Sequence, residues 1–152
     1  YSWVRADGGG PISKLCVGRV ADLGSEGDLG RRATRRLRRR LRSKLAAPHR
    51  CPDTPSLVGT IRSGTSGAIA FDAARKVGAQ HGAIELELKL TTPQGDVLWG
   101  SGFVRGRAIW LRGDTLLDTR EAQRSSRQAA VDELVDDLVN RFMTLPALEE
   151  TP

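Results

Sequence analysis

The sequence predicts an α+β fold in which two amphipathic helices pack on one face of a mixed four-stranded β-sheet, in the order β-α-β-β-β-α. Residues 29–46 and 119–145 carry apolar side chains every three or four positions, which is typical of amphipathic helices. Residues 83–111 alternate between apolar and polar side chains on either side of a turn, which predicts a β-hairpin. Two short apolar runs, at 14–20 and 56–62, predict the remaining strands.

The length of 152 residues fits one compact domain spanning residues 1–152. We expect a flexible lead-in at 1–12, which contains Gly-Gly-Gly-Pro, and a flexible tail at 147–152. No apolar run approaches the roughly 18 residues that a membrane-spanning helix needs. Because the chain starts at Tyr1 without a Met, we interpret it as a mature or trimmed form.

The helix predicted over 29–46 combines one apolar stripe with a dense cationic face. Asp28 is its expected N-cap, and Pro48 stops it. Residues 31–44 hold eight Arg and one Lys with no acid, so the formal net charge of +6 would be 6 − 9 = −3 without them. The basicity of the chain therefore belongs to one element. The stripe recurs every four residues and comprises Leu29, Ala33, Leu37, Leu41 and Leu45.

In the predicted hairpin, leucines and one isoleucine at 84–90 alternate with polar residues, and Thr92 closes a three-residue loop against Asp96. In the register that follows, paired residue numbers sum to 188, so that Leu90 faces Leu98 and Lys89 faces Trp99. The leucine face is expected to meet the helices. The opposite face then carries Trp99, Phe103, Arg105 and Arg107.

Two further segments complete the prediction. Residues 63–82 are the least legible, and they include a helix-compatible piece at 71–80. The last helix, 119–145, starts at a capping-box-like Asp118 and is followed by Pro146. We expect its acids, including Asp132 and Asp136, to lie on a solvated face.

The sequence offers no catalytic or metal-binding pattern. His49 and His81 are isolated, and neither a GxSxG elbow nor a Walker A loop is present. Cys16 and Cys51 do not have zinc-site spacing. They are either buried thiols or one disulfide, and the sequence leaves both open. We therefore predict a protein that is not an enzyme and that needs no cofactor or metal.

Two surfaces are candidates for binding instead. A row of arginines suits clustered phosphates, because a guanidinium donates two parallel hydrogen bonds. Nucleic acid, anionic lipid and the phosphorylated sugars of lipopolysaccharide all qualify as ligands, and a merely solvated basic face is the alternative. The predicted anion-binding residues are Arg31, Arg35, Arg38, Arg39 and Arg42. The predicted partner-binding residues are Trp99, Phe103, Arg105 and Arg107, unless residues 63–82 or the N-terminal segment cover them.

Several segments, taken in order, resemble the LptE-like family of lipopolysaccharide-assembly lipoproteins. Tyr1-Ser2-Trp3 matches the residues that follow a lipidated Cys-Gly, and Pro11 to Val17 matches the first strand. Leu57 to Ile61 and Thr92 to Trp99 match the second strand and the hairpin turn, and 121–139 approximates the final helix. The Arg-rich helix, the two cysteines, the segment 63–82 and Thr92 in place of the usual Asp depart from the family pattern.

The resemblance implies a non-enzymatic lipoprotein on the periplasmic side of the outer membrane, attached through a lipid on a Cys upstream of Tyr1. Its partners would be lipopolysaccharide and an LptD-like β-barrel translocon, which it would plug and help to assemble while assisting lipopolysaccharide insertion. No nucleic acid is expected. Two alternatives remain: another envelope lipoprotein, such as a peptidoglycan-synthase activator, or a nucleic-acid-binding module using the Arg helix. An aromatic content of 5% disfavours the second.

Overall fold

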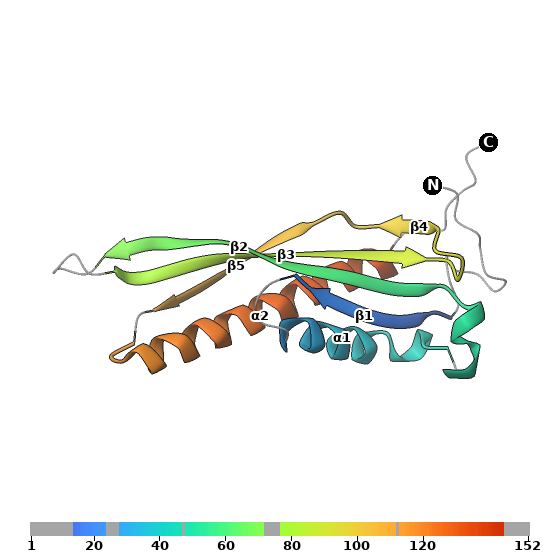
Figure 1. The fold of residues 1–152 in the computed structure, drawn as a ribbon, viewed down its shortest axis with the longest axis horizontal. Coiled ribbons are helices and arrows are strands. Elements are labelled where there is room, and N and C mark those ends of the chain that lie inside the picture. The colour runs from blue at the N-terminus through green and yellow to red at the C-terminus, as the bar shows by residue number, and fades with distance from the viewer. Residues whose placement is uncertain (1–13, 24–27, 47, 72–76, 112, 145–152) are drawn as a thin grey trace.

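The computed structural model describes residues 14–23, 28–46, 48–71, 77–111 and 113–144, so the predicted lead-in and tail lie outside the described residues. The described chain forms two layers: a twisted mixed sheet, with both helices on one of its faces (Figure 1). The α+β class is confirmed, with five strands where four were predicted.

The elements follow one another as β1 (Cys16–Asp22), α1 (Asp28–Arg40), η1 (Arg42–Lys44), η2 (Pro48–Asp53), β2 (Ser56–Phe71), β3 (Val77–Thr91), β4 (Val97–Gly100), β5 (Val104–Leu111) and α2 (Leu116–Met143). β1 runs parallel to β2, and the other neighbouring strands are antiparallel. β4 and β5 pair with successive parts of β3. The fifth strand therefore arises because the strand predicted at the end of the hairpin is broken in two.

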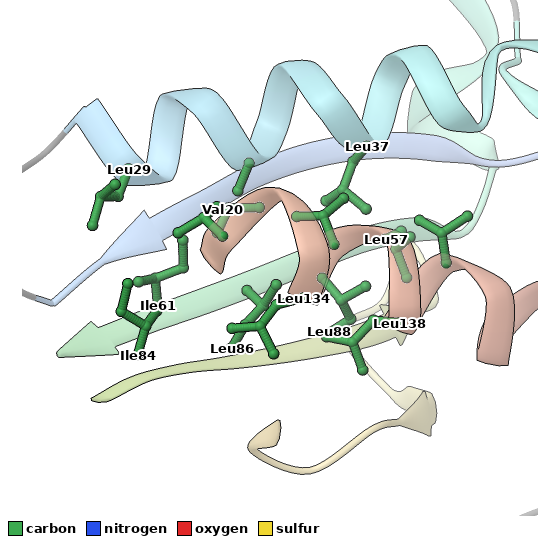
Figure 2. Packing of buried hydrophobic residues seen from close by; sticks show 14 of the residues in the cluster. Val20, Leu29, Leu37, Leu57, Ile61, Ile84, Leu86, Leu88, Leu134 and Leu138 are labelled. Carbon is green, nitrogen blue, oxygen red and sulfur yellow. The ribbon is translucent and has the colours of Figure 1, made fainter. Parts of the chain in front are cut away.

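The core lies between the sheet and the two helices. Figure 2 shows Leu29 and Leu37 of α1 pointing toward the strands, with the leucines of β3 meeting α2 from the sheet side. Leu37 and Leu88 are completely buried. Each such side chain contributes on the order of 2 kcal/mol, so the apolar stripe holds α1 against the sheet despite its charge. The helix ends at Arg40 rather than Ala46, and η1 follows it.

The predicted hairpin turn is confirmed. The Thr92 N–H donates to the Asp96 carbonyl at 2.8 Å, and Gly95 takes the left-handed conformation with φ of 94°. The predicted register is wrong beyond the turn. Leu90 pairs with Trp99, because the ladder shifts by one residue between Leu90 and Thr91. A one-residue shift turns every following side chain to the other face.

A second shift restores the alternation. At Ser101 the side-chain Oγ, rather than a carbonyl, accepts the Leu88 N–H at 2.9 Å, and Gly102 has φ of 65°. Beyond this point Glu85 pairs with Arg105. As a result Trp99 lies on the helix side, contrary to prediction, and its ring centroid is 5.3 Å from that of Phe142.

Residues 63–82 extend the β2–β3 hairpin. The pairing continues from Ser63 with Ile84 to Phe71 with Val77. The helix-compatible interpretation of 71–80 is therefore wrong for the described part of this segment, and 72–76 lie outside the described residues. The cross-strand pairing overrides a weak local helical preference.

Helix α2 starts three residues earlier than predicted. Thr115 is its N-cap and accepts the Asp118 N–H at 3.1 Å, so Asp118 is not the cap. The helix also approaches β5 closely, because a Cβ on Gly106 would lie 3.0 Å from the Leu134 side chain. Because Gly106 has no side chain, α2 can pack directly on β5.

The two helices lie side by side and run parallel, joined by what we call the arginine ladder. Its rungs each join residues 100 positions apart: Arg32 to Asp132, Arg36 to Asp136, and Arg40 to Asn140. The first two rungs are bidentate, with Nε and Nη2 donating at 2.7–2.9 Å. The expectation that Asp132 and Asp136 lie on a solvated face is wrong, because both accept hydrogen bonds from α1.

Charge pairing in the ladder shifts the pKa values of its members. Hydrogen bonds from Arg36 hold the pKa of Asp136 below its ordinary value, and they raise the pKa of Arg36 in turn. The pKa of Arg32 is likewise raised by its hydrogen bonds to Asp132. The two carboxylates of the ladder thus offset two of the three positive charges in this column of the cationic helix.

Cys16 and Cys51 form a disulfide with a Cα–Cα distance of 5.7 Å, which settles the choice that the sequence left open. The bond joins the start of β1 to η2. On the same side of the molecule, the Leu15 N–H donates to the Lys44 carbonyl at 2.8 Å. The disulfide and this hydrogen bond together fix the loop that follows α1.

We expect replacement of both cysteines by Ser to lower the free energy of unfolding by about 4 kcal/mol, the chain-entropy cost of releasing a loop of this size. The change should appear in urea unfolding curves of the double variant. Reduction of the unaltered protein with dithiothreitol should produce the same loss, and an unchanged midpoint after verified reduction would contradict the prediction.

Neutralising the ladder with Asp132→Asn and Asp136→Asn should lower the free energy of unfolding at pH 7 by about 1–2 kcal/mol, because the arginines lose partly buried bidentate partners. The matched control, Glu133→Gln with Asp137→Asn, removes the same charge from the exposed side of α2 and should cost less than half as much. Equal losses in the two variants would contradict a specific role for the ladder.

The contribution of Asp136 should also depend on pH. Its pKa is lower in the folded state, so its stabilisation is present above the unfolded pKa of about 3.9 and is lost as pH falls through the folded value. The stability gap between the native chain and the ladder variant should therefore narrow between about pH 5 and pH 2. Melting curves across that range provide the measurement.

Candidate functional site

Four arginines on the solvent side of α1 and η1 form a surface that we call the outer arginines: Arg31, Arg35, Arg39 and Arg42. All four are exposed, and among the residues that the structure describes none of them has an ion pair or a hydrogen bond. These four belong to the set predicted to bind anions. The fifth, Arg38, is also exposed, but it donates from Nη2 to the Val17 carbonyl at 3.1 Å and so is tied to β1.

The outer arginines repel one another. Arg31, Arg35 and Arg39 follow at intervals of four, so each lies one turn above the last on the same side of the helix. Like charges at this spacing cost about 0.2–0.5 kcal/mol per pair. The ladder offsets this repulsion for its own column, whereas the outer column has no acid among the described residues to offset it.

A hollow of about 210 Å³ lies where the two columns meet. It is lined by Arg32, Arg35, Arg36, Arg39 and Asp132. Asp132 is the least exposed of the ladder's charged groups, with 19% of its side chain accessible, and it also lies 3.7 Å from Nη1 of Arg36. The hollow therefore presents four guanidinium groups against one carboxylate that is already engaged.

Sequence reasoning missed the ladder and this hollow, although a signal was present. Arginines at 32, 36 and 40 and acceptors at 132, 136 and 140 both recur every fourth residue. Two columns with matching spacing, one of donors and one of acceptors, fit two packed helices, but nothing in a single sequence says that these two helices are neighbours.

The sheet face opposite the helices carries the second predicted surface. We call its exposed residues Phe103, Arg105 and Arg107 the Phe103 face. The Arg62 guanidinium lies over the Phe103 ring, 3.7 Å from its centroid, and Arg62 also donates to Glu85 at 2.9 Å. Phe103 is 36% exposed, and Arg105 and Arg107 are exposed beside it on β5. Trp99 does not belong to this surface, because its ring packs against Phe142 in the core layer.

The described residues contain no group of His, Cys, Asp and Glu placed to hold a metal ion. No helix in the described part of the chain is long and apolar enough to cross a membrane. The surfaces that remain for binding among the predicted site residues are the hollow with its outer arginines and the Phe103 face of the sheet.

Comparison with known proteins shows a fold relationship. No model of a protein family matches the chain, and no curated protein matches it. Among solved structures, the rare lipoprotein B of Shewanella oneidensis is similar, with a TM-score of 0.60 and 14% identity over 85% of this chain and 92% of that one. Lipoprotein B of Nitrosomonas europaea has a TM-score of 0.58 and 10% identity, over 88% and 84%.

The PelC dodecamer of Paraburkholderia phytofirmans is also similar, with a TM-score of 0.51 and 15% identity over 84% of this chain and 86% of that one. At these identities the likeness concerns the fold and not the activity. It extends over most of the chain and most of each of these structures, so the overall fold is shared. The chain thus has a fold found in solved bacterial lipoproteins.

Proposed function

We propose that this chain is a non-enzymatic lipoprotein of the LptE-like kind, lipid-anchored to the outer membrane on its periplasmic side, which helps a β-barrel lipopolysaccharide translocon to assemble and assists lipopolysaccharide insertion. The observation that carries the proposal is the fold shared with rare lipoprotein B over 85% of this chain. The segments that resemble the family, from Pro11 to the last helix, occur in the same order along the chain.

The Cys16–Cys51 disulfide supports an envelope location. Disulfides form and persist in oxidising compartments such as the bacterial periplasm, and they are rare in the cytosol. In this proposal a lipidated Cys upstream of Tyr1 tethers the domain through the segment before β1.

The Phe103 face is the proposed contact with the barrel. A mostly polar barrel lumen suits a partner surface that mixes one large ring with cations, because Arg105 and Arg107 can pair with acidic groups while Phe103 supplies apolar contact. Arg62 already stacks on this ring and bonds to Glu85, so the ring is held in a fixed position before any partner arrives.

The outer arginines are the proposed contact with lipopolysaccharide. Guanidinium groups bind phosphate through paired donors, and this column has no acid among the described residues to compete with a ligand. The barrel and the lipid would then meet different faces of the domain, the barrel on the open face of the sheet and the lipid on α1.

The barrel contact can be tested by combining Phe103→Ala with Arg105→Gln and Arg107→Gln. We expect capture of the co-expressed translocon to fall at least about tenfold, since a central ring and two flanking cations are lost together. The melting temperature should change little, because these side chains lie on the open face of the sheet.

Trp99→Ala is the matched aromatic control for this experiment. It should lower the free energy of unfolding by about 3 kcal/mol, because its ring packs against Phe142, and the folded fraction should still capture the translocon. Full capture by the triple variant would remove the Phe103 face as the barrel contact. Absence of any translocon from the unaltered protein's complexes would contradict the proposed function itself.

A further inference from the structure

The hollow between the two arginine columns has a composition that differs from the rest of the cationic face. Four of its five lining residues are arginines, and they come from adjacent turns of α1. Two of them, Arg32 and Arg36, belong to the ladder, and two, Arg35 and Arg39, belong to the outer arginines. Fixed and unpaired guanidinium groups therefore face the same space.

The ladder arginines retain hydrogen-bonding capacity although they are paired. A guanidinium has five N–H donors, and each bidentate bond to Asp132 or Asp136 uses two of them. Because these bonds hold Arg32 and Arg36 in place, little side-chain entropy would be lost when their remaining donors engage an anion. The ladder thus preorganises half of the lining.

The outer pair supplies the excess charge. Arg35 and Arg39 lie one helical turn apart and have no partner among the described residues, so their mutual repulsion is not offset. Asp132, the one acid in the lining, already accepts two hydrogen bonds from Arg32. An anion that bridges Arg35 and Arg39 would relieve the repulsion, and a doubly charged anion would relieve it more.

We propose that this hollow is a discrete binding site for one phosphate monoester, in which Arg32 and Arg36 act as fixed donors and Arg35 and Arg39 close on the anion. A monoester offers three terminal oxygens and close to two negative charges near neutral pH, because its second pKa is about 6. A phosphodiester offers two such oxygens and one charge, so it binds more weakly. The assignment of lipopolysaccharide sugar phosphates as the natural ligand rests on the proposed function, whereas the phosphate site itself does not.

Titration of the 152-residue chain with glucose 1-phosphate, at constant ionic strength maintained with chloride, tests the site. Side-chain Nε–Hε resonances of arginine report which guanidinium groups respond. We expect saturable shifts confined to the four lining arginines, a higher melting temperature with ligand, and at least about tenfold weaker binding of dimethyl phosphate. Binding should weaken as pH falls below about 6, where the monoester loses one charge.

Two double variants separate a discrete site from a diffuse positive field. Arg35→Gln with Arg39→Gln should weaken glucose 1-phosphate binding at least about tenfold, whereas Arg31→Gln with Arg42→Gln removes the same charge outside the hollow and should weaken it less than about threefold. All four positions are exposed, and none makes a hydrogen bond or an ion pair with a described residue, so both variants should fold. Equal losses in the two variants, or shifts that do not saturate, would overturn the proposal.

A second experiment, with lipid vesicles, tests whether lipopolysaccharide supplies the phosphate. Phosphatidylcholine vesicles carrying lipopolysaccharide should retain the native chain and release the Arg35/Arg39 double variant, and vesicles carrying phosphatidylglycerol at equal charge should not separate the two proteins. If sugar phosphate binding depends on Arg35 and Arg39 but vesicle binding does not, the site stands and lipopolysaccharide is removed as its ligand. That outcome leaves the translocon experiment unaffected, so the two proposals can fail separately.

Discussion

The pairing of Arg32 and Arg36 with Asp132 and Asp136 is the interaction on which the helical layer depends. Arginines cover most of the circumference of α1, so their side chains repel one another and repel any neighbouring cation. Two carboxylates on α2 offset most of the charge of the column that faces the second helix, while the apolar stripe of α1 packs against the sheet. With one side buried and another paired, the remaining arginines can stay charged and exposed without preventing the fold.

The thirteen residues of α1 thus carry three separate roles, on different sides of the helix. Leucines face the sheet, ladder arginines face α2, and outer arginines face solvent. The residues of each group recur every four positions, so each group stays on its own side of the helix. A substitution on α1 can therefore change packing, helix docking or ligand binding according to its position around the axis, and the proposed hollow lies on the boundary between the last two groups.

The sequence predicted those features that depend on local periodicity. The leucines of β3, the turn closed by Thr92 and the stripe of α1 all follow from spacing that a single chain displays. The position of Trp99 could not be predicted, because it depends on a shift beside Thr91 that leaves no mark in the alternation of residues. The second shift, at Ser101 and Gly102, adds to the first and displaces the pairing by two residues in all. A displacement of two residues restores the alternation of faces, which is why Arg105 and Arg107 lie on the face that the simple alternation predicts.

The ladder also has a consequence for how α2 is positioned along its axis. Arg36 lies 3.7 Å from Asp132 and Arg40 lies 3.5 Å from Asp136, so each acid already attracts the arginine one turn further along. Sliding α2 by one turn, about 5.4 Å, would exchange one set of charge pairs for the other. Charge pairing is therefore nearly degenerate with respect to this slide, much as a uniform coiled-coil seam is. Side-chain packing therefore selects one position of α2 over the other. The selecting contacts are those of Leu134 with Gly106 and of Phe142 with Trp99. Gly106 and the Trp99 ring thus determine where α2 lies along its axis, whereas the ladder arginines attach it to α1.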